Sequence, residues 1–68
     1  MSTPMYPGVH VQLTGEDGNI FSIMGRTTAA MREAGLPETA IRPFVSDMFD
    51  CPSYADALGV VGRYVSTA

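Results

Sequence analysis

Alternating apolar and polar positions mark the first regular element of the chain. Three apolar residues alternate with His10 and Gln12 over residues 9–13. Since successive side chains of a strand point to opposite faces, this alternation predicts a half-buried β-strand with His10 facing solvent. A lone strand leaves unpaired backbone groups along its edges, so we expect it to pair with residues 65–67 or with the same strand of a second chain.

The strand is followed by a turn rich in residues that adopt unusual backbone angles, namely Gly15, Asp17, Gly18 and Asn19. The Asp-Gly pair is compatible with a hairpin in which residues 20–24 form a second strand. The alternative is that Asn19 caps a helix. Apolar residues recur at steps of three and four from Ile20 to Met31, and this spacing favours the helix.

Start and stop signals divide the rest of the chain into three helices. The first covers about 20–34 and ends at Gly35, because glycine suits the left-handed conformation that terminates helices. The second covers about 37–49 and is expected to break at Pro43, which lacks an amide hydrogen. The third covers about 54–65. The predicted fold class is mainly α, a compact three-helix domain with a short N-terminal β-strand.

The third helix has the clearest start signal in the sequence. Ser53 followed by Asp56 matches a capping box, in which the serine caps the helix and the acid reaches back. Two apolar faces can be drawn on this helix. The broader face contains Tyr54, Ala57, Leu58, Val61 and Val65, and the narrower one contains Val60 and Tyr64.

The domain organisation predicted from these elements is simple. Residues 1–8 contain Pro4, Pro7 and Gly8 and are expected to form a flexible tail. Residues 9–68 are expected to form a single small helical domain.

The short chain limits how the fold can be stabilised. It has 68 residues and Cys51 is its one cysteine, so an intrachain disulfide is excluded. His10 is the one histidine, which leaves too few ligands for structural zinc, and we expect no metal or cofactor. Small domains without such links usually rely on regular helix packing, oligomers or partners. The chain is therefore expected to bind itself or a host protein, as a homo-oligomer or a heteromeric complex.

Composition supports this expectation. Hydrophobic residues make up 46% and charged residues only 16% of the chain, and there are five methionines. Few charges leave an apolar patch exposed, and methionine suits adaptable contact surfaces. The expected contact residues lie outside or at the rim of the predicted core stripes, and they are Met5, Tyr6, Tyr54, Val60 and Tyr64.

Charge and targeting signals narrow the class of partner. The net charge is −3, and the four arginines are dispersed, so nucleic acid is an improbable partner. No apolar run approaches the ~18 residues of a membrane span, and the first eight residues lack a signal-peptide pattern. We therefore expect a cytoplasmic location and no membrane partner.

Candidate chemistry is sparse. Cys51 has no neighbouring base in the sequence, and His10 falls on the predicted strand, so we predict that the protein is not an enzyme. Two alternatives to a protein–protein interaction module remain open. The loop over residues 15–19 could bind a small ligand or nucleotide, and the second and third helices could form a minimal DNA-binding regulator.

One segment resembles a known group of proteins. Residues 13–21 read Leu-Thr-Gly-Glu-Asp-Gly-Asn-Ile-Phe, residues 32–35 read Arg-Glu-Ala-Gly, and Tyr54 opens the last helix. These features resemble small uncharacterised proteins of actinobacterial phages and mobile elements that share a Leu-x-Gly-x-Asp-Gly-Asn-x-Phe motif, although Pro43 departs from that pattern. The resemblance implies a mostly helical domain in a bacterial or phage cytoplasm and no known activity. The resemblance therefore suggests an interaction module that is encoded by a phage and modulates a host protein.

Overall fold

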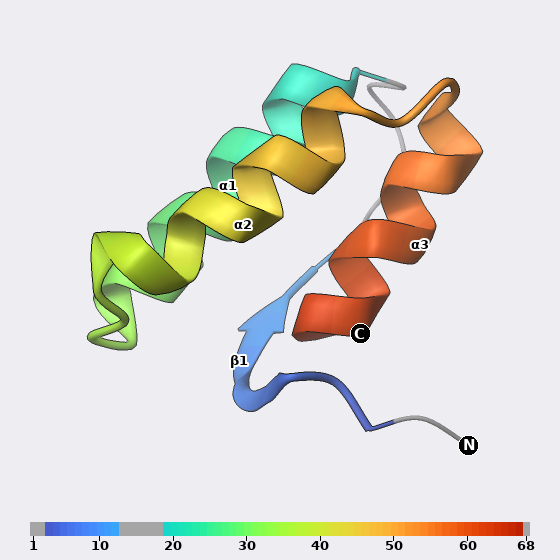
Figure 1. The fold of residues 1–68 in the computed structure, drawn as a ribbon. Coiled ribbons are helices and arrows are strands. Elements are labelled where there is room, and N and C mark those ends of the chain that lie inside the picture. Colours follow the sequence, from blue (N-terminus) through green and yellow to red (C-terminus); the bar gives the residue numbers. More distant parts are fainter. Residues whose placement is uncertain (1–2, 13–18, 68) are drawn as a thin grey trace.

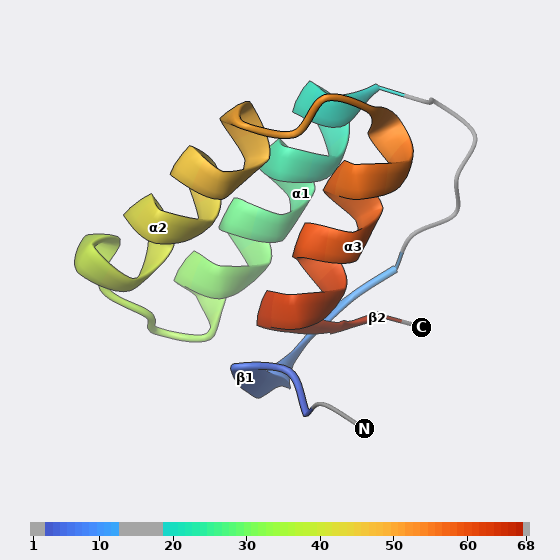
Figure 2. The same cartoon turned by 45° about the vertical axis from the view of Figure 1, so that its right-hand side comes forward.

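The structure, a computed structural model, describes residues 3–12 and 19–67 of the chain (Figure 1). Three helices pack side by side, and two strands lie beside the C-terminal end of the last helix (Figure 2). The elements in chain order are β1 (Tyr6–Val11), α1 (Ile20–Glu33), α2 (Glu38–Phe49), α3 (Tyr54–Tyr64) and β2 (Val65–Thr67). The predicted fold class is confirmed.

Both ends of α1 are formed by the residues that the sequence indicated. The side chain of Asn19 accepts a 2.8 Å hydrogen bond from the amide of Phe21, which caps the first turn. Residues 20–24 are therefore helical. At the other end Gly35 has a φ of 88°, and the amide of Leu36 donates to the carbonyl of Met31, which completes a Schellman motif.

The expected break at Pro43 is wrong, because α2 runs without interruption from Glu38 to Phe49. Pro43 is exposed and cannot donate the helical hydrogen bond to Thr39, which is also exposed. Water can solvate the carbonyl that is left free. Buried side chains on both sides of the proline, Ile41 and Phe44, keep the helix packed against the core.

Ser53 caps α3 as predicted, and Asp56 bonds to the serine hydroxyl rather than to its backbone amide. The hydroxyl of Ser53 accepts from the amide of Asp56 at 3.2 Å and donates to its Oδ2 at 3.0 Å. The carboxylate thus reaches back to the serine side chain and fixes the entry to the helix. The other predicted turn residues, Gly15, Asp17 and Gly18, lie outside the described residues.

The strand pairs within the chain. β1 and β2 form a parallel pair in which His10 lies opposite Ser66, and the hydroxyl of Ser66 donates a 2.8 Å hydrogen bond to the carbonyl of Pro7. The pairing partner is thus residues 65–67, the first of the two expected. The strand begins at Tyr6 rather than at residue 9, so residues 6–8 of the predicted tail belong to β1. His10 is exposed, as predicted.

The core lies between the three helices and β1. Val60 and Tyr64 belong to it, with only 5% and 7% of their surface exposed, so the expectation that they lie at the rim is wrong. α3 buries residues of both predicted apolar faces, Ala57 and Val61 from the broader one and Val60 and Tyr64 from the narrower one, and Tyr64 packs edge-on against Phe44. The buried apolar residues are Val9, Val11, Ile23, Met31, Ile41, Phe44, Met48, Ala57, Val60, Val61, Tyr64 and Val65.

Within the described ranges, no helix is both long and apolar enough to cross a lipid bilayer.

Candidate functional site

An apolar groove lies between the first turns of α1 and the last turn of α2. It has a volume of about 200 Å³. We call it the Phe21–Phe49 groove, and its lining residues are Ile20, Phe21, Met24, Met48, Phe49 and Cys51. Small-molecule sites usually enclose ~300–1,000 Å³, so this groove suits one or two protein side chains better than a whole ligand.

Two exposed aromatic rings border the groove. Phe21 and Phe49 each expose 64% of their surface, and their ring centroids are 6.0 Å apart in an edge-to-face arrangement. Each ring leaves most of its apolar surface in water, which is costly unless another surface covers it. Met24 lines the same groove and is half-buried, and its flexible thioether chain adapts to different apolar shapes, whereas Met48 is buried at the base of the groove.

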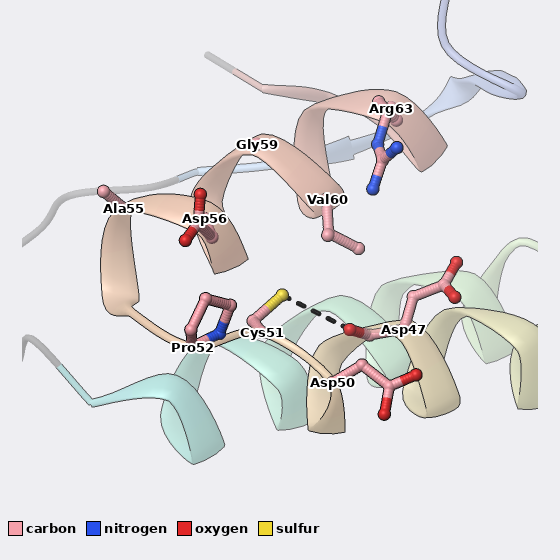
Figure 3. Close-up of a pocket in the computed structure, with 9 residues that line it drawn as sticks. All are labelled: Asp47, Asp50, Cys51, Pro52, Ala55, Asp56, Gly59, Val60 and Arg63. Carbon is pink, nitrogen blue, oxygen red and sulfur yellow. Dashed lines mark hydrogen bonds between the residues drawn. The ribbon is translucent and has the colours of Figure 1, made fainter.

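A second, polar hollow adjoins the groove at Cys51, which lines both (Figure 3). This acidic hollow lies between the C-terminal end of α2 and α3 and has a volume of about 530 Å³. Its lining residues are Asp47, Asp50, Cys51, Pro52, Ala55, Asp56, Gly59, Val60 and Arg63. The lining therefore contains three carboxylates and one guanidinium, so the formal charge of the hollow is negative.

The charges at the end of α2 are poorly compensated. The negative end of a helix dipole favours cations, yet the last turn of α2 has no basic residue. Instead Asp47 lies in that turn, and Asp50 caps it through its backbone. The ion pair found in the described residues joins Arg32 at the end of α1 to Glu38 at the start of α2, so it does not neutralise the carboxylates at the end of α2.

Three of the polar side chains in the hollow have internal partners, and one of them is Asp56, which is bonded to Ser53. Asp47 Oδ2 accepts a 2.6 Å hydrogen bond from the hydroxyl of Tyr64, and the thiol of Cys51 donates to the Asp47 carbonyl at 3.3 Å. Burial, followed by the neighbouring Asp47 carboxylate, raises the pKa of Tyr64 to about 12. The carboxylate of Asp50, in contrast, is exposed and has no hydrogen-bond partner among the described side chains.

The five contact residues expected from the sequence differ in how far they are exposed. Met5 exposes 61% of its surface beside β1, and Tyr6 and Tyr54 are half-buried. Val60 and Tyr64 are in the core. None of the first three lines the groove or the acidic hollow, whereas Val60 lines the hollow.

Sequence reasoning missed the two rings that border the groove. Phe49 lies four residues after Val45, a helical spacing that indicates a core position, yet it is largely exposed. Phe21 lies outside the stripe that runs from Ile20 to Met31, and that displacement was the available signal. A large aromatic residue on the polar face of an amphipathic helix indicates a contact surface.

The described residues hold no cluster of three or more His, Cys, Asp or Glu side chains that could bind a metal ion. His10 is on β1 and Cys51 is in the connection after α2, and no hydrogen bond joins them in the described part of the chain. The geometry brings carboxylates and exposed apolar side chains next to one another around Cys51. Comparisons with protein-family models, with curated proteins and with solved structures found no match to this chain.

Proposed function

We propose that the protein is a non-enzymatic protein–protein interaction module whose binding site is the Phe21–Phe49 groove. The observation that carries this proposal is the pair of exposed phenylalanine rings at the border of an apolar groove. Aromatic residues and methionine are enriched at the centres of protein interfaces, whereas exposed apolar surface in water is unfavourable. Covering these rings with a partner removes that cost.

The arrangement of the rings suits recognition. The two rings come from different helices, so their spacing is fixed by the packing of α1 against α2. A rigid site needs little reordering on binding, which lowers the entropic cost of association. The resemblance to small phage proteins supports a modulator of a host protein as the biological form of this module, acting in the bacterial cytoplasm.

A random-peptide display library tests the proposal with a defined probe. Peptides are selected on the immobilised wild-type protein and then measured against the double variant Phe21→Ser/Phe49→Ser. We expect selected peptides to lose at least about tenfold in affinity, because clustered aromatic contacts dominate interface energies. The variant Met5→Ser is the matched control, since it removes an equally exposed apolar side chain away from the groove.

Two results would contradict the proposal. One is that no peptide is enriched on the wild-type protein. The other is that enriched peptides bind the double variant as tightly as they bind the wild-type protein. Circular dichroism of both variants checks that the fold is retained, which the exposure of all three side chains favours. Chemical-shift mapping of a selected peptide on the wild-type protein locates the site independently of any variant.

A further inference from the structure

Building on the function proposed above, we infer that the groove receives a positively charged amphipathic segment of another protein. One or two of its apolar side chains insert beside the phenylalanine rings, and an Arg or Lys of the same segment lies next to Asp50. The partner is thus specified by two features together, an apolar face and a flanking cation.

The first observation behind this inference is the position of the carboxylates. Asp50 directly follows Phe49 in the chain, and Cys51 lines both the groove and the acidic hollow. An occupant of the groove therefore comes within reach of the charges in the hollow. The hollow contains three carboxylates and only Arg63 as a cation, so its charge is complementary to a basic segment.

A second observation is the unfavourable charge at the end of α2. Asp47 and Asp50 lie where the helix dipole already places negative potential, and the last turn of α2 lacks a basic residue. The Asp47 carboxylate is bonded to Tyr64, whereas the Asp50 carboxylate has no hydrogen-bond partner among the described side chains. A cation supplied by a partner would relieve the repulsion between Asp50 and the helix carbonyls, so binding gains from a charge that the described fold does not use.

The same charges disfavour other occupants. A second copy of this chain carries a net charge of −3 and would bring the same carboxylates against Asp50 in a symmetric contact. Nucleic acid is likewise repelled by the three carboxylates of the acidic hollow. A basic protein segment is the occupant that satisfies both the apolar groove and the charges beside it.

Three synthetic amphipathic helical peptides test this inference. They share one apolar face and differ only at the flanking positions, which are Arg in the first peptide, Gln in the second and Glu in the third. Binding is measured by fluorescence anisotropy. We expect the Arg peptide to bind at least about tenfold more tightly than the Glu peptide. Raising NaCl from ~0.05 to ~0.5 M should reduce this difference, because salt screens exposed charges.

The variant Asp50→Asn tests the specific contact. We expect it to weaken binding of the Arg peptide by about two- to fivefold, the range for an exposed ion pair, with little effect on the Gln peptide. The matched control is Glu33→Gln, which makes the same change of charge at the opposite end of α1 and should leave binding unchanged. Asp47 and Asp56 are left intact because their side chains hold Tyr64 and Ser53.

The outcomes separate this inference from the proposed function. Equal binding of all three peptides, lost in Phe21→Ser/Phe49→Ser, overturns the role of charge and leaves the interaction module standing. Failure of all three peptides, while library-selected peptides still bind through the two rings, also overturns only the basic segment. Equal binding of the Arg peptide to the wild type and the double variant overturns the groove as the site, and with it the proposed function.

Discussion

The hydroxyl of Tyr64 donates a 2.6 Å hydrogen bond to Oδ2 of Asp47, which ties the last turn of α3 to α2. The ring of Tyr64 also stands edge-on to Phe44, with centroids 5.3 Å apart and planes at 73°. Tyr64 therefore joins the two helices by an apolar contact and by a bond to a charged group.

Removing the hydroxyl measures the polar part of that contact. Tyr64→Phe keeps the ring against Phe44 but leaves the Asp47 carboxylate without its donor. We expect a loss of about 2 kcal/mol in the free energy of unfolding, as is typical of a hydrogen bond to a charged group. Urea denaturation gives the value. Tyr54→Phe is the control, since no hydrogen bond of the Tyr54 hydroxyl is found in the described part of the chain; an equal loss there would show that the bond to Asp47 is unimportant.

The same pair makes stability depend on pH at the alkaline end. The pKa of Tyr64 is raised from 10 to about 12 in the folded state, so the unfolded chain releases this proton first. The stabilisation is fully present below pH 10 and is lost as the pH rises from 10 toward 12. Denaturation midpoints across this window should fall more steeply for the wild type than for Tyr64→Phe. Parallel curves would contradict the assignment.

Gly35 and Gly25 should respond oppositely to alanine. Gly35 has a φ of 88°, which strains any residue with a Cβ, so Gly35→Ala should destabilise the protein by about 1 kcal/mol. Gly25 is inside α1 with no atom within 4 Å of an added Cβ, so Gly25→Ala should stabilise it by about 1 kcal/mol. Thermal unfolding of both variants checks the signs. A stabilising Gly35→Ala would contradict the left-handed helix end at Gly35, and a destabilising Gly25→Ala would contradict the open space at Gly25.

Thr27 offers a stabilising substitution. Its side chain is fully buried, and its Oγ1 has no hydrogen-bond partner among the described residues. Thr27→Val keeps the shape and removes the unsatisfied hydroxyl, so we expect a gain of about 1 kcal/mol in stability. Thr28→Val is the comparison, because Thr28 Oγ1 donates to the Gly25 carbonyl at 3.0 Å and that bond would be lost. Should Thr27→Val destabilise more than Thr28→Val, a bonded role for the Thr27 hydroxyl would be indicated.

The features predicted correctly from the sequence depend on short-range hydrogen bonds. Asn19 and Ser53 cap helices by bonding to amides two and three residues further along the chain. Gly35 ends α1 through carbonyls in the turn before it. Such contacts are encoded in a few neighbouring residues, and three helices with approximate limits follow from them.

The features that the sequence did not reveal depend on contacts between elements. The helix α2 continues through Pro43 because buried residues on both sides of the proline belong to the core. The sequence did not reveal that Tyr64 is buried, because its contacts with Phe44 and Asp47 are made to another helix, α2. The exposed position of Phe49 likewise depends on where α2 ends relative to α1. None of these relationships has a local pattern that identifies it.

The parallel pairing of β1 with β2 also determines when the fold can be completed. Pro7 and Ser66, which share a hydrogen bond across the two strands, are 59 positions apart. A ribosome therefore makes β1 first and must finish all three helices before the mate of that strand exists. Until then β1 has an open edge, and closing so long a loop is slow. A nascent chain stalled after α3 should thus be the form most prone to aggregate or to be degraded.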